Sequence, residues 1–95
     1  MIVRVKALAF LREAIGGFET RVEVPGRSSI SVGELLEILA ERYPRIRDLV
    51  GDPLEALGDL LHVLVNGRNV IHMNGPKTLI RDGDTVVLFP LAGGG

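Results

Sequence analysis

The sequence predicts a single α+β domain in which one main helix packs on a mixed sheet. Alternating apolar and polar residues near both ends of the chain are typical of half-buried strands. They are separated by one segment whose apolar residues recur at helical spacing. The chain has 95 residues, of which 46% are hydrophobic and 24% charged, and this composition favours one globular domain with its own core.

Two strands and a short helix are predicted in the N-terminal quarter. Residues 1–10 alternate, with Val3, Val5 and Ala7 on the apolar side. Residues 11–15 favour a helical turn that stops at two glycines, because glycine readily takes the left-handed conformation that ends a helix. Residues 18–24 alternate again and predict a second strand, which is ended by Pro25.

One amphipathic helix follows. Ser31 can cap its N-terminus while Glu34 reaches back to the amide of the cap, which is a capping box. The apolar stripe consists of Val32, Leu35, Leu36, Leu39, Ala40 and Tyr43. Pro44 discourages continuation. Beyond it, Asp52-Pro53 favours a further short helix that runs to residue 57.

A hairpin and a last strand complete the predicted fold. Residues 61–65 and 68–71 flank Asn66-Gly67, the dipeptide that best tolerates the two positive φ angles of a type I′ turn. Turns at residues 74–76 and 82–84 lead into a β-branched and aromatic strand over residues 85–89, which Pro90 ends.

Conventional catalytic and metal sites are not favoured by the side chains present. If hairpin pairing continues outward from the turn, His62 lies opposite Ile71 and His72 opposite Leu61, so the two histidines face opposite sides of the sheet. We therefore expect no metal site, since metals need several convergent ligands. Asp82 and Asp84 flank a turn glycine, where aspartate is expected to bond the backbone.

Composition excludes other classes of function. The chain has no cysteine, which excludes disulfide scaffolds and thiol chemistry and suits a cytoplasmic location. Eleven basic and twelve acidic residues give a net charge of −1, so no long-range field attracts nucleic acid or an anionic membrane. No apolar run has the roughly 20 residues of a membrane-spanning helix. We expect neither nucleic-acid nor membrane partners.

The C-terminal Gly93-Gly94-Gly95 is the unusual feature. At the average glycine frequency of about 7%, three in succession at a chosen place have a probability of roughly 0.03%. A frayed tail would explain them, since termini are often poorly ordered. However, a five-residue tail extends about 16 to 18 Å from the last strand, and its side-chain-free end can enter a channel too narrow for any Cβ. The terminal carboxylate is ionised at neutral pH and can attack an activated phosphate.

Short motifs along the whole chain resemble the small subunit of molybdopterin synthase, within the ubiquitin-like β-grasp sulfur-carrier superfamily. These motifs are Val3-Arg4-Val5-Lys6, Phe10-Leu11-Arg12-Glu13 with Gly16, Val65-Asn66-Gly67, Leu79, Asp82-Gly83-Asp84-Thr85-Val86 and Phe89-Pro90-Leu91-Ala92-Gly93-Gly94-Gly95. The family usually ends in aromatic-Pro-x-x-small-Gly-Gly, so counting from Phe89 places Gly94-Gly95 on the functional pair. The resemblance implies a β-grasp domain over residues 1–90 and a flexible tail over residues 91–95.

The same resemblance implies a function for the tail. An adenylyltransferase of the ubiquitin-activating type uses ATP to convert the Gly95 carboxylate to an acyl adenylate, and a sulfur-transfer enzyme then supplies the sulfur of a thiocarboxylate. The tail enters the large synthase subunit, where the sulfur attacks precursor Z in molybdenum cofactor biosynthesis. This chain is then a sulfur-donating subunit without an active site or permanently bound cofactor of its own.

Docking on the partner is expected to use Phe89, Pro90, Leu91, Ala92, Gly93 and Gly94. Whether Phe89 lies in the core or at the interface is open, whereas the interface is favoured for Leu91. Four alternatives remain: a sulfur carrier for thiamine synthesis, a sulfur carrier for tRNA thiolation, a ubiquitin-like modifier joined through Gly95 to lysines of other proteins, and a plain interaction module. The predicted helix at residues 11–15 disfavours the thiamine carriers, which resemble this chain but typically lack that insert.

Overall fold

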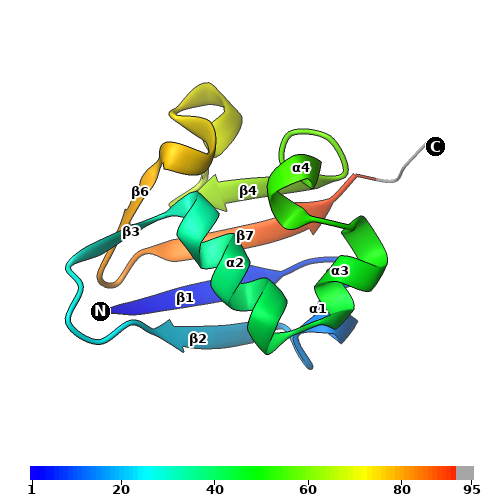
Figure 1. The fold of residues 1–95 in the computed structure, drawn as a ribbon, viewed down its shortest axis with the longest axis horizontal. Coiled ribbons are helices and arrows are strands. Elements are labelled where there is room, and N and C mark those ends of the chain that lie inside the picture. The colour runs from blue at the N-terminus through cyan, green and yellow to red at the C-terminus, as the bar shows by residue number, and fades with distance from the viewer. Residues whose placement is uncertain (92–95) are drawn as a thin grey trace.

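A mixed five-stranded sheet forms one layer of the protein, and helices cover one of its faces (Figure 1). The structure is a computed structural model that describes residues 1–91. The strands of the sheet are β1 (Ile2–Ala7), β2 (Glu19–Glu23), β4 (Leu61–Val65), β5 (Arg68–Asn69) and β7 (Thr85–Pro90), in the order β2-β1-β7-β4-β5. The central strands β1 and β7 are parallel, and the other neighbours are antiparallel. The predicted mixed sheet is therefore confirmed.

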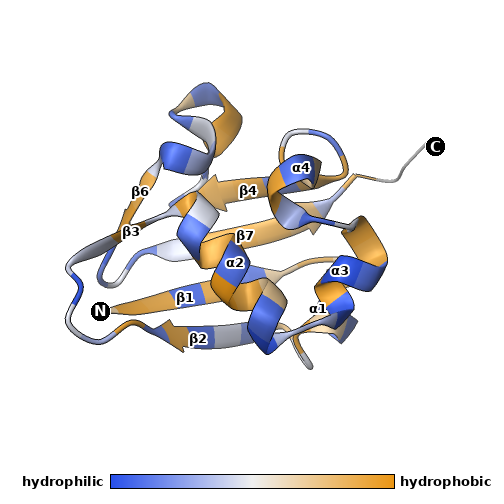
Figure 2. Ribbon diagram, viewed as in Figure 1, coloured by the Kyte–Doolittle hydropathy of each residue, from blue (hydrophilic) through white to orange (hydrophobic). Residues whose placement is uncertain are grey.

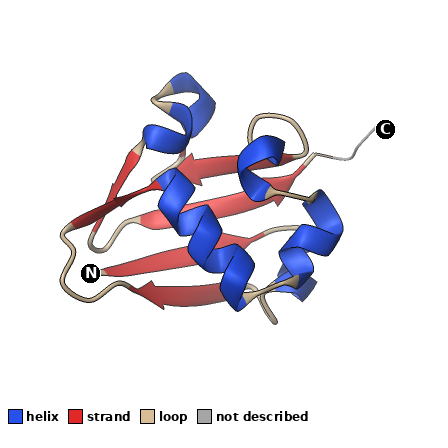
Figure 3. Cartoon of the chain, in the orientation of Figure 1, coloured by secondary structure: helices blue, strands red, loops and turns tan. Residues whose placement is uncertain are grey.

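The helices lie together on that face of the sheet (Figure 3). They are α1 (Leu11–Ala14), α2 (Val32–Arg42), α3 (Arg45–Val50) and α4 (Pro53–Ala56), and two 3-10 turns follow at η1 (Val70–His72) and η2 (Gly75–Lys77). The strands β3 (Ser29–Ser31) and β6 (Leu79–Arg81) form a separate antiparallel pair. Neither was predicted, because three residues with one buried position give no recognisable alternation.

The alternation predicted for β1 is confirmed: Val3, Val5 and Ala7 are buried. Figure 2 shows hydrophilic residues interrupting the hydrophobic ones along the strand. The strand ends at Ala7, however, and the prediction that it continues to residue 10 was wrong. Ala9 has a φ of 52°, which extended strands do not contain, and the chain turns there into α1. As a result Leu8 and Phe10 are exposed outside the strand.

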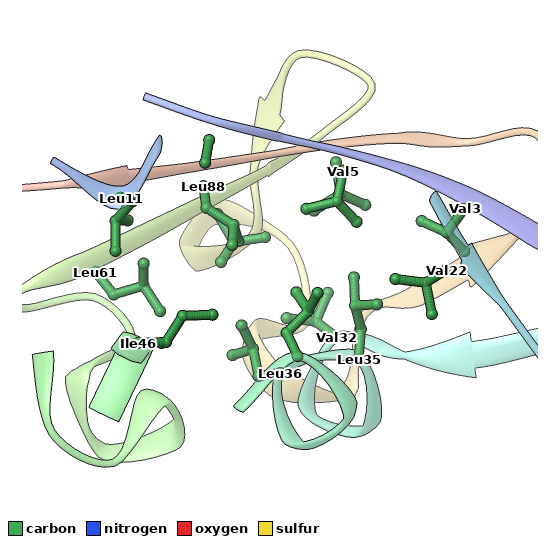
Figure 4. Packing of buried hydrophobic residues seen from close by; sticks show 14 of the residues in the cluster. Val3, Val5, Leu11, Val22, Val32, Leu35, Leu36, Ile46, Leu61 and Leu88 are labelled. Atoms are coloured by element: carbon green, nitrogen blue, oxygen red, sulfur yellow. The ribbon is translucent and has the colours of Figure 1, made fainter. Parts of the chain in front are cut away.

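The predicted capping box of α2 is present. The Glu34 amide donates to Ser31 Oγ at 3.0 Å, and the Ser31 amide donates to Glu34 Oε1 at 3.2 Å. The stripe of the helix supplies much of the core, which Figure 4 shows between the helix and the strands. The core residues that Figure 4 labels are Val3, Val5, Leu11, Val22, Val32, Leu35, Leu36, Ile46, Leu61 and Leu88.

The capping box predicts a pH dependence of stability. Hydrogen bonds from the Arg27 side chain, and then from the Ser31 amide, lower the pKa of Glu34 below its usual range. The folded state therefore favours the ionised form more than the unfolded state does. This contribution is complete above the unfolded pKa of about 4.3 and is lost as the pH falls through the lower folded pKa. Urea titrations across this range should show a smaller acid loss for Glu34→Gln, and an identical loss would contradict the assignment.

The segment after Pro44 holds the helix α3, which was not predicted. Pro44 was interpreted only as a terminator, but its φ of −59° also suits the start of a new helix. The neighbouring prediction is confirmed, since the Asp52 side chain accepts the Leu54 amide at 3.1 Å and α4 begins at Pro53.

The hairpin between β4 and β5 has the predicted turn, with φ angles of 48° at Asn66 and 86° at Gly67. Replacing Gly67 by alanine should cost about 1–2 kcal/mol, because a Cβ is disfavoured in the left-handed region. Gly17→Ala is the matched control: Gly17 does not have a positive φ, and a Cβ there meets nothing within 4 Å. Equal destabilisation of both variants in urea denaturation would argue against the turn.

Candidate functional site

The C-terminal end of β7 is held firmly up to the point where the predicted tail begins. Pro90 pairs with Leu61 of β4, and the Leu91 amide donates to the Leu60 carbonyl at 2.9 Å. The strand thus includes Pro90, one residue beyond the predicted end. The predicted site residues Ala92, Gly93, Gly94 and Gly95 lie outside the described residues. The residue before them, Leu91, is nevertheless fixed at the C-terminal end of a central strand of the sheet.

Phe89 lies on the face of the sheet opposite the helices. Its neighbours Val86 and Leu88 are buried towards the helices, and strand alternation turns Phe89 the other way. Its ring stacks on the imidazole of His62, with centroids 5.2 Å apart and planes at 25°. Phe89 is therefore half-buried on the helix-free face, where a partner can reach it, and it is not among the core residues.

Exposed apolar side chains continue this surface. Leu91 is 46% exposed, as expected for an interface residue. The Leu8 amide donates to the Leu88 carbonyl at 3.0 Å, which places Leu8, 40% exposed, beside the end of β7. We call Leu8, Phe89 and Leu91 the apolar rim of the tail. Leu8 was missed because it was assigned to the first strand, and a shorter strand ending at Ala7 would have revealed it.

Two positive charges lie beside an exposed aromatic ring just before β2. The Phe18 ring is 49% exposed, and the Lys6 ammonium and the Arg12 guanidinium lie 5.9 and 5.4 Å from its centroid. Such contacts hold flexible cations near an aromatic face. Phe18 was predicted on the apolar side of the second strand, and that prediction was wrong, since β2 begins at Glu19.

The histidines occupy different places from those predicted. Only Leu64 and Val65 pair with β5, because the chain turns into η1 at Val70. The expected pairing of His62 with Ile71 and of His72 with Leu61 is therefore wrong. His62 lies opposite Phe89 instead, and its Nδ1 lies 3.0 Å from Asn69 Nδ2. In residues 1–91 no three His, Cys, Asp or Glu side chains group where they could hold a metal ion.

The aspartates of the last turn bind the backbone, as predicted. Asp82 accepts the Ile2 amide at 2.7 Å, and Asp84 accepts the Arg81 amide at 2.8 Å. Asp84 also accepts the Asn66 side-chain amide at 3.0 Å. Asp82 thus ties the turn to the start of β1, and Asp84 ties it to the hairpin, so both carboxylates have structural partners. The site therefore consists of a fixed attachment point for the tail and an apolar surface around it.

Comparison with known proteins assigns the chain to a family. The sequence profile described as the ThiS family matches residues 5–95. The chain belongs to the ThiS family. Relatives of this kind are ubiquitin-like sulfur carriers and modifiers, and their β-grasp fold is that of the structure described above.

Three ThiS-family relatives bear on the function. The small archaeal modifier protein 3 of Haloferax volcanii is 35% identical over an alignment of 86 residues, and the match covers 82% of this chain and 92% of that protein. A putative molybdopterin converting factor, subunit 1, from Pyrococcus furiosus is 29% identical, with a TM-score of 0.73 and coverage of 95% of this chain and 97% of that one. The Amycolatopsis orientalis BexX/CysO complex contains a chain that is 30% identical, with a TM-score of 0.70 and coverage of 98% and 99%.

One of these relatives was solved in a complex with a second protein. ThiS-family relatives thus act with partner proteins. In the described part of this chain, no helix is both long and apolar enough to cross a membrane.

Proposed function

We propose that this protein is the sulfur-carrying small subunit of a molybdopterin synthase, with the Gly95 carboxyl group as its reactive end. The observation that carries the proposal is a run of three glycines that begins three residues after the end of β7, where Leu60 and Leu61 hold the chain. The likeness to the molybdopterin converting factor subunit supports the choice of pathway.

The chemistry begins with activation of the tail. The Gly95 carboxylate attacks the α-phosphate of ATP on an adenylating partner, and pyrophosphate leaves. Sulfur from a sulfur-transfer enzyme then displaces AMP and leaves a thiocarboxylate. Adenylation supplies a good leaving group, and the thiocarboxylate is a soft nucleophile that stays ionised at neutral pH. The protein itself supplies the carrier, while the adenylation site and the pterin site belong to its partners.

Delivery requires the tail to enter the large synthase subunit. The apolar rim lies where the tail leaves the sheet. Docking through Leu8, Phe89 and Leu91 would therefore bring the tail to the partner surface. The sulfur then attacks precursor Z to build the dithiolene of molybdopterin. Glycines at the end of the tail suit a narrow channel, because they carry no Cβ.

The docking step predicts a strong effect of Leu91→Asp. A charge at the centre of an apolar interface should weaken binding to the large subunit at least tenfold, or about 1.4 kcal/mol. Leu79→Asp is the matched control, because Leu79 is similarly exposed at 50% but lies in β6, away from the rim. Equal affinities of the two variants in titration calorimetry would contradict docking through the rim.

A modifier function is the second candidate, favoured by the likeness to a small archaeal modifier protein. In that case a lysine amine of a target protein attacks the same acyl adenylate, an isopeptide bond to Gly95 forms, and AMP leaves. Mass analysis of the protein isolated from its own host distinguishes the two. Replacement of one oxygen by sulfur supports the carrier, whereas peptides branched through Gly95 support the modifier. Binding to a thiazole synthase in place of a molybdopterin synthase large subunit would instead indicate thiamine synthesis, and transfer of the sulfur to tRNA would indicate thiolation.

A further inference from the structure

The chain is poor in amines that could attack an activated carboxyl group. Of its eleven basic residues, nine are arginine and two are lysine, Lys6 and Lys77. Arginine stays protonated and is a poor nucleophile, so it does not compete. The primary amines to compare are therefore those of Lys6, Lys77 and Met1, and the structure places them in different surroundings.

The amine of Met1 is engaged between strands. It donates to the Val24 carbonyl at 3.0 Å in a partly buried position, and the Val24 amide donates back to the Met1 carbonyl at 2.9 Å. Attack by this amine would break a pairing that extends the edge of β1 and β2. Met1 is therefore held as part of the sheet.

Lys6 is held along the sheet as well. It lies within β1 between Glu19 of β2 and Val87 of β7 and is half-buried. Its ammonium group lies 5.9 Å from the Phe18 centroid, in a cation–π contact. Reaction at Lys6 would require a tail to lie across the middle strands of the sheet.

Lys77 is presented differently, at the end of the η2 turn. The residue is exposed and makes no ion pair with residues 1–91. The three preceding residues, Asn74, Gly75 and Pro76, carry no charge, and a Cβ added at Gly75 would meet nothing within 4 Å. A glycine tail therefore has steric room here.

The turn that carries Lys77 is nevertheless fixed to the domain. Thr78 is 2% exposed, and its hydroxyl accepts the Asn74 amide at 3.1 Å. Pro76 packs so closely on α2 that a Cβ added at Gly33 would lie 3.3 Å from its carbonyl oxygen. Lys77 thus combines a fixed backbone with an exposed side chain that makes no ion pair with residues 1–91.

We propose that Lys77 accepts the C-terminal glycine of a second copy of this protein, as a modification site for self-conjugation. The inference rests on the proposed activation of Gly95. The unprotonated Lys77 amine attacks the Gly95 carbonyl carbon of the acyl adenylate. A C–N bond forms, the bond to the phosphate oxygen breaks, AMP leaves, and the amine proton passes to solvent. Figure 1 shows η2 and the end of β7 on opposite sides of the molecule, so the donor tail comes from another copy.

The test incubates the full chain with Mg-ATP and the adenylating enzyme of its own host, and follows ATP–pyrophosphate exchange and the masses of the products. We expect a covalent dimer that has lost one water relative to two chains. Since trypsin cuts after Arg81, the donor leaves residues 82–95 attached to Lys77 within peptide 69–81. Lys77→Arg should lose the dimer but keep the exchange, and the matched control Lys6→Arg should keep both.

Each other outcome overturns the proposal. Exchange without a dimer, a branch on Lys6 or Met1, or a cyclised monomer would show that Lys77 is not the acceptor in trans, while leaving the carrier function intact. An absence of exchange would refute the activation of Gly95 itself, and with it both this inference and the proposed carrier. Exchange measured in the same sample separates the two failures.

Discussion

Deletion of Gly95 should abolish adenylation of this protein without changing its Tm. The adenylating partner must bring a carboxylate to the α-phosphate of ATP, and removing one residue withdraws that carboxylate by about 3.5 Å. A shift of 1 Å can already cost a hundredfold in rate when reacting groups are misplaced. The Tm should stay unchanged, because all the core residues lie between Val3 and Leu88.

The matched control is Gly17→Ala. It keeps the length of the chain and the whole tail, and a Cβ at Gly17 meets nothing within 4 Å, so adenylation should persist. ATP–pyrophosphate exchange with the host adenylating enzyme measures the activation, and calorimetry measures the Tm. A truncated protein that folds and still accepts adenylate would contradict the role of Gly95.

Truncation of Leu35 to alanine should destabilise the fold by about 2–5 kcal/mol. Leu35 is fully buried where α2 meets the sheet, and its loss leaves a cavity that neighbouring strands can fill only in part. Since domains of this size are stable by about 5–15 kcal/mol, the variant should be partly unfolded on mild heating. Urea denaturation gives the change in the free energy of unfolding.

Leu79→Ala serves as its control, since the same side chain is 50% exposed in β6. We expect a change within about 0.5 kcal/mol. If the two variants lost similar stability, the helix would not be packed on the sheet as described. Both variants keep the tail, so adenylation of the folded fraction should continue in each.

Elements defined by neighbouring residues could be predicted from the sequence. The capping box of Ser31 and Glu34 and the turn at Gly67 are local, because the interacting groups lie within three residues of one another. The pairing of β3 with β6 is different, because Ile30 and Ile80 are fifty residues apart in the sequence. No pattern of neighbouring residues predicts that these two segments pair. Such short strands exist only because the rest of the fold brings them together.

The candidate site likewise has one feature that could be predicted from the sequence and one that could not. The exposure of Leu91 could be predicted from its place before the glycines, whereas its role at an interface stays a prediction. The stacking of His62 on Phe89 could not be predicted, because it depends on the antiparallel pairing of β4 with β7 and on β5 ending after two residues. The hairpin rule gives the partners nearest the turn correctly, but tertiary packing decides where the pairing stops.

The parallel pairing of β1 with β7 has a consequence for protein synthesis. Arg4 of the first strand lies beside Thr85 of the last, so the centre of the sheet cannot form until almost the whole chain has left the ribosome. The strand that completes the fold is also the strand that carries the glycines. A chain whose translation stops early lacks both, and an activating enzyme would therefore meet a reactive terminus only on a finished domain.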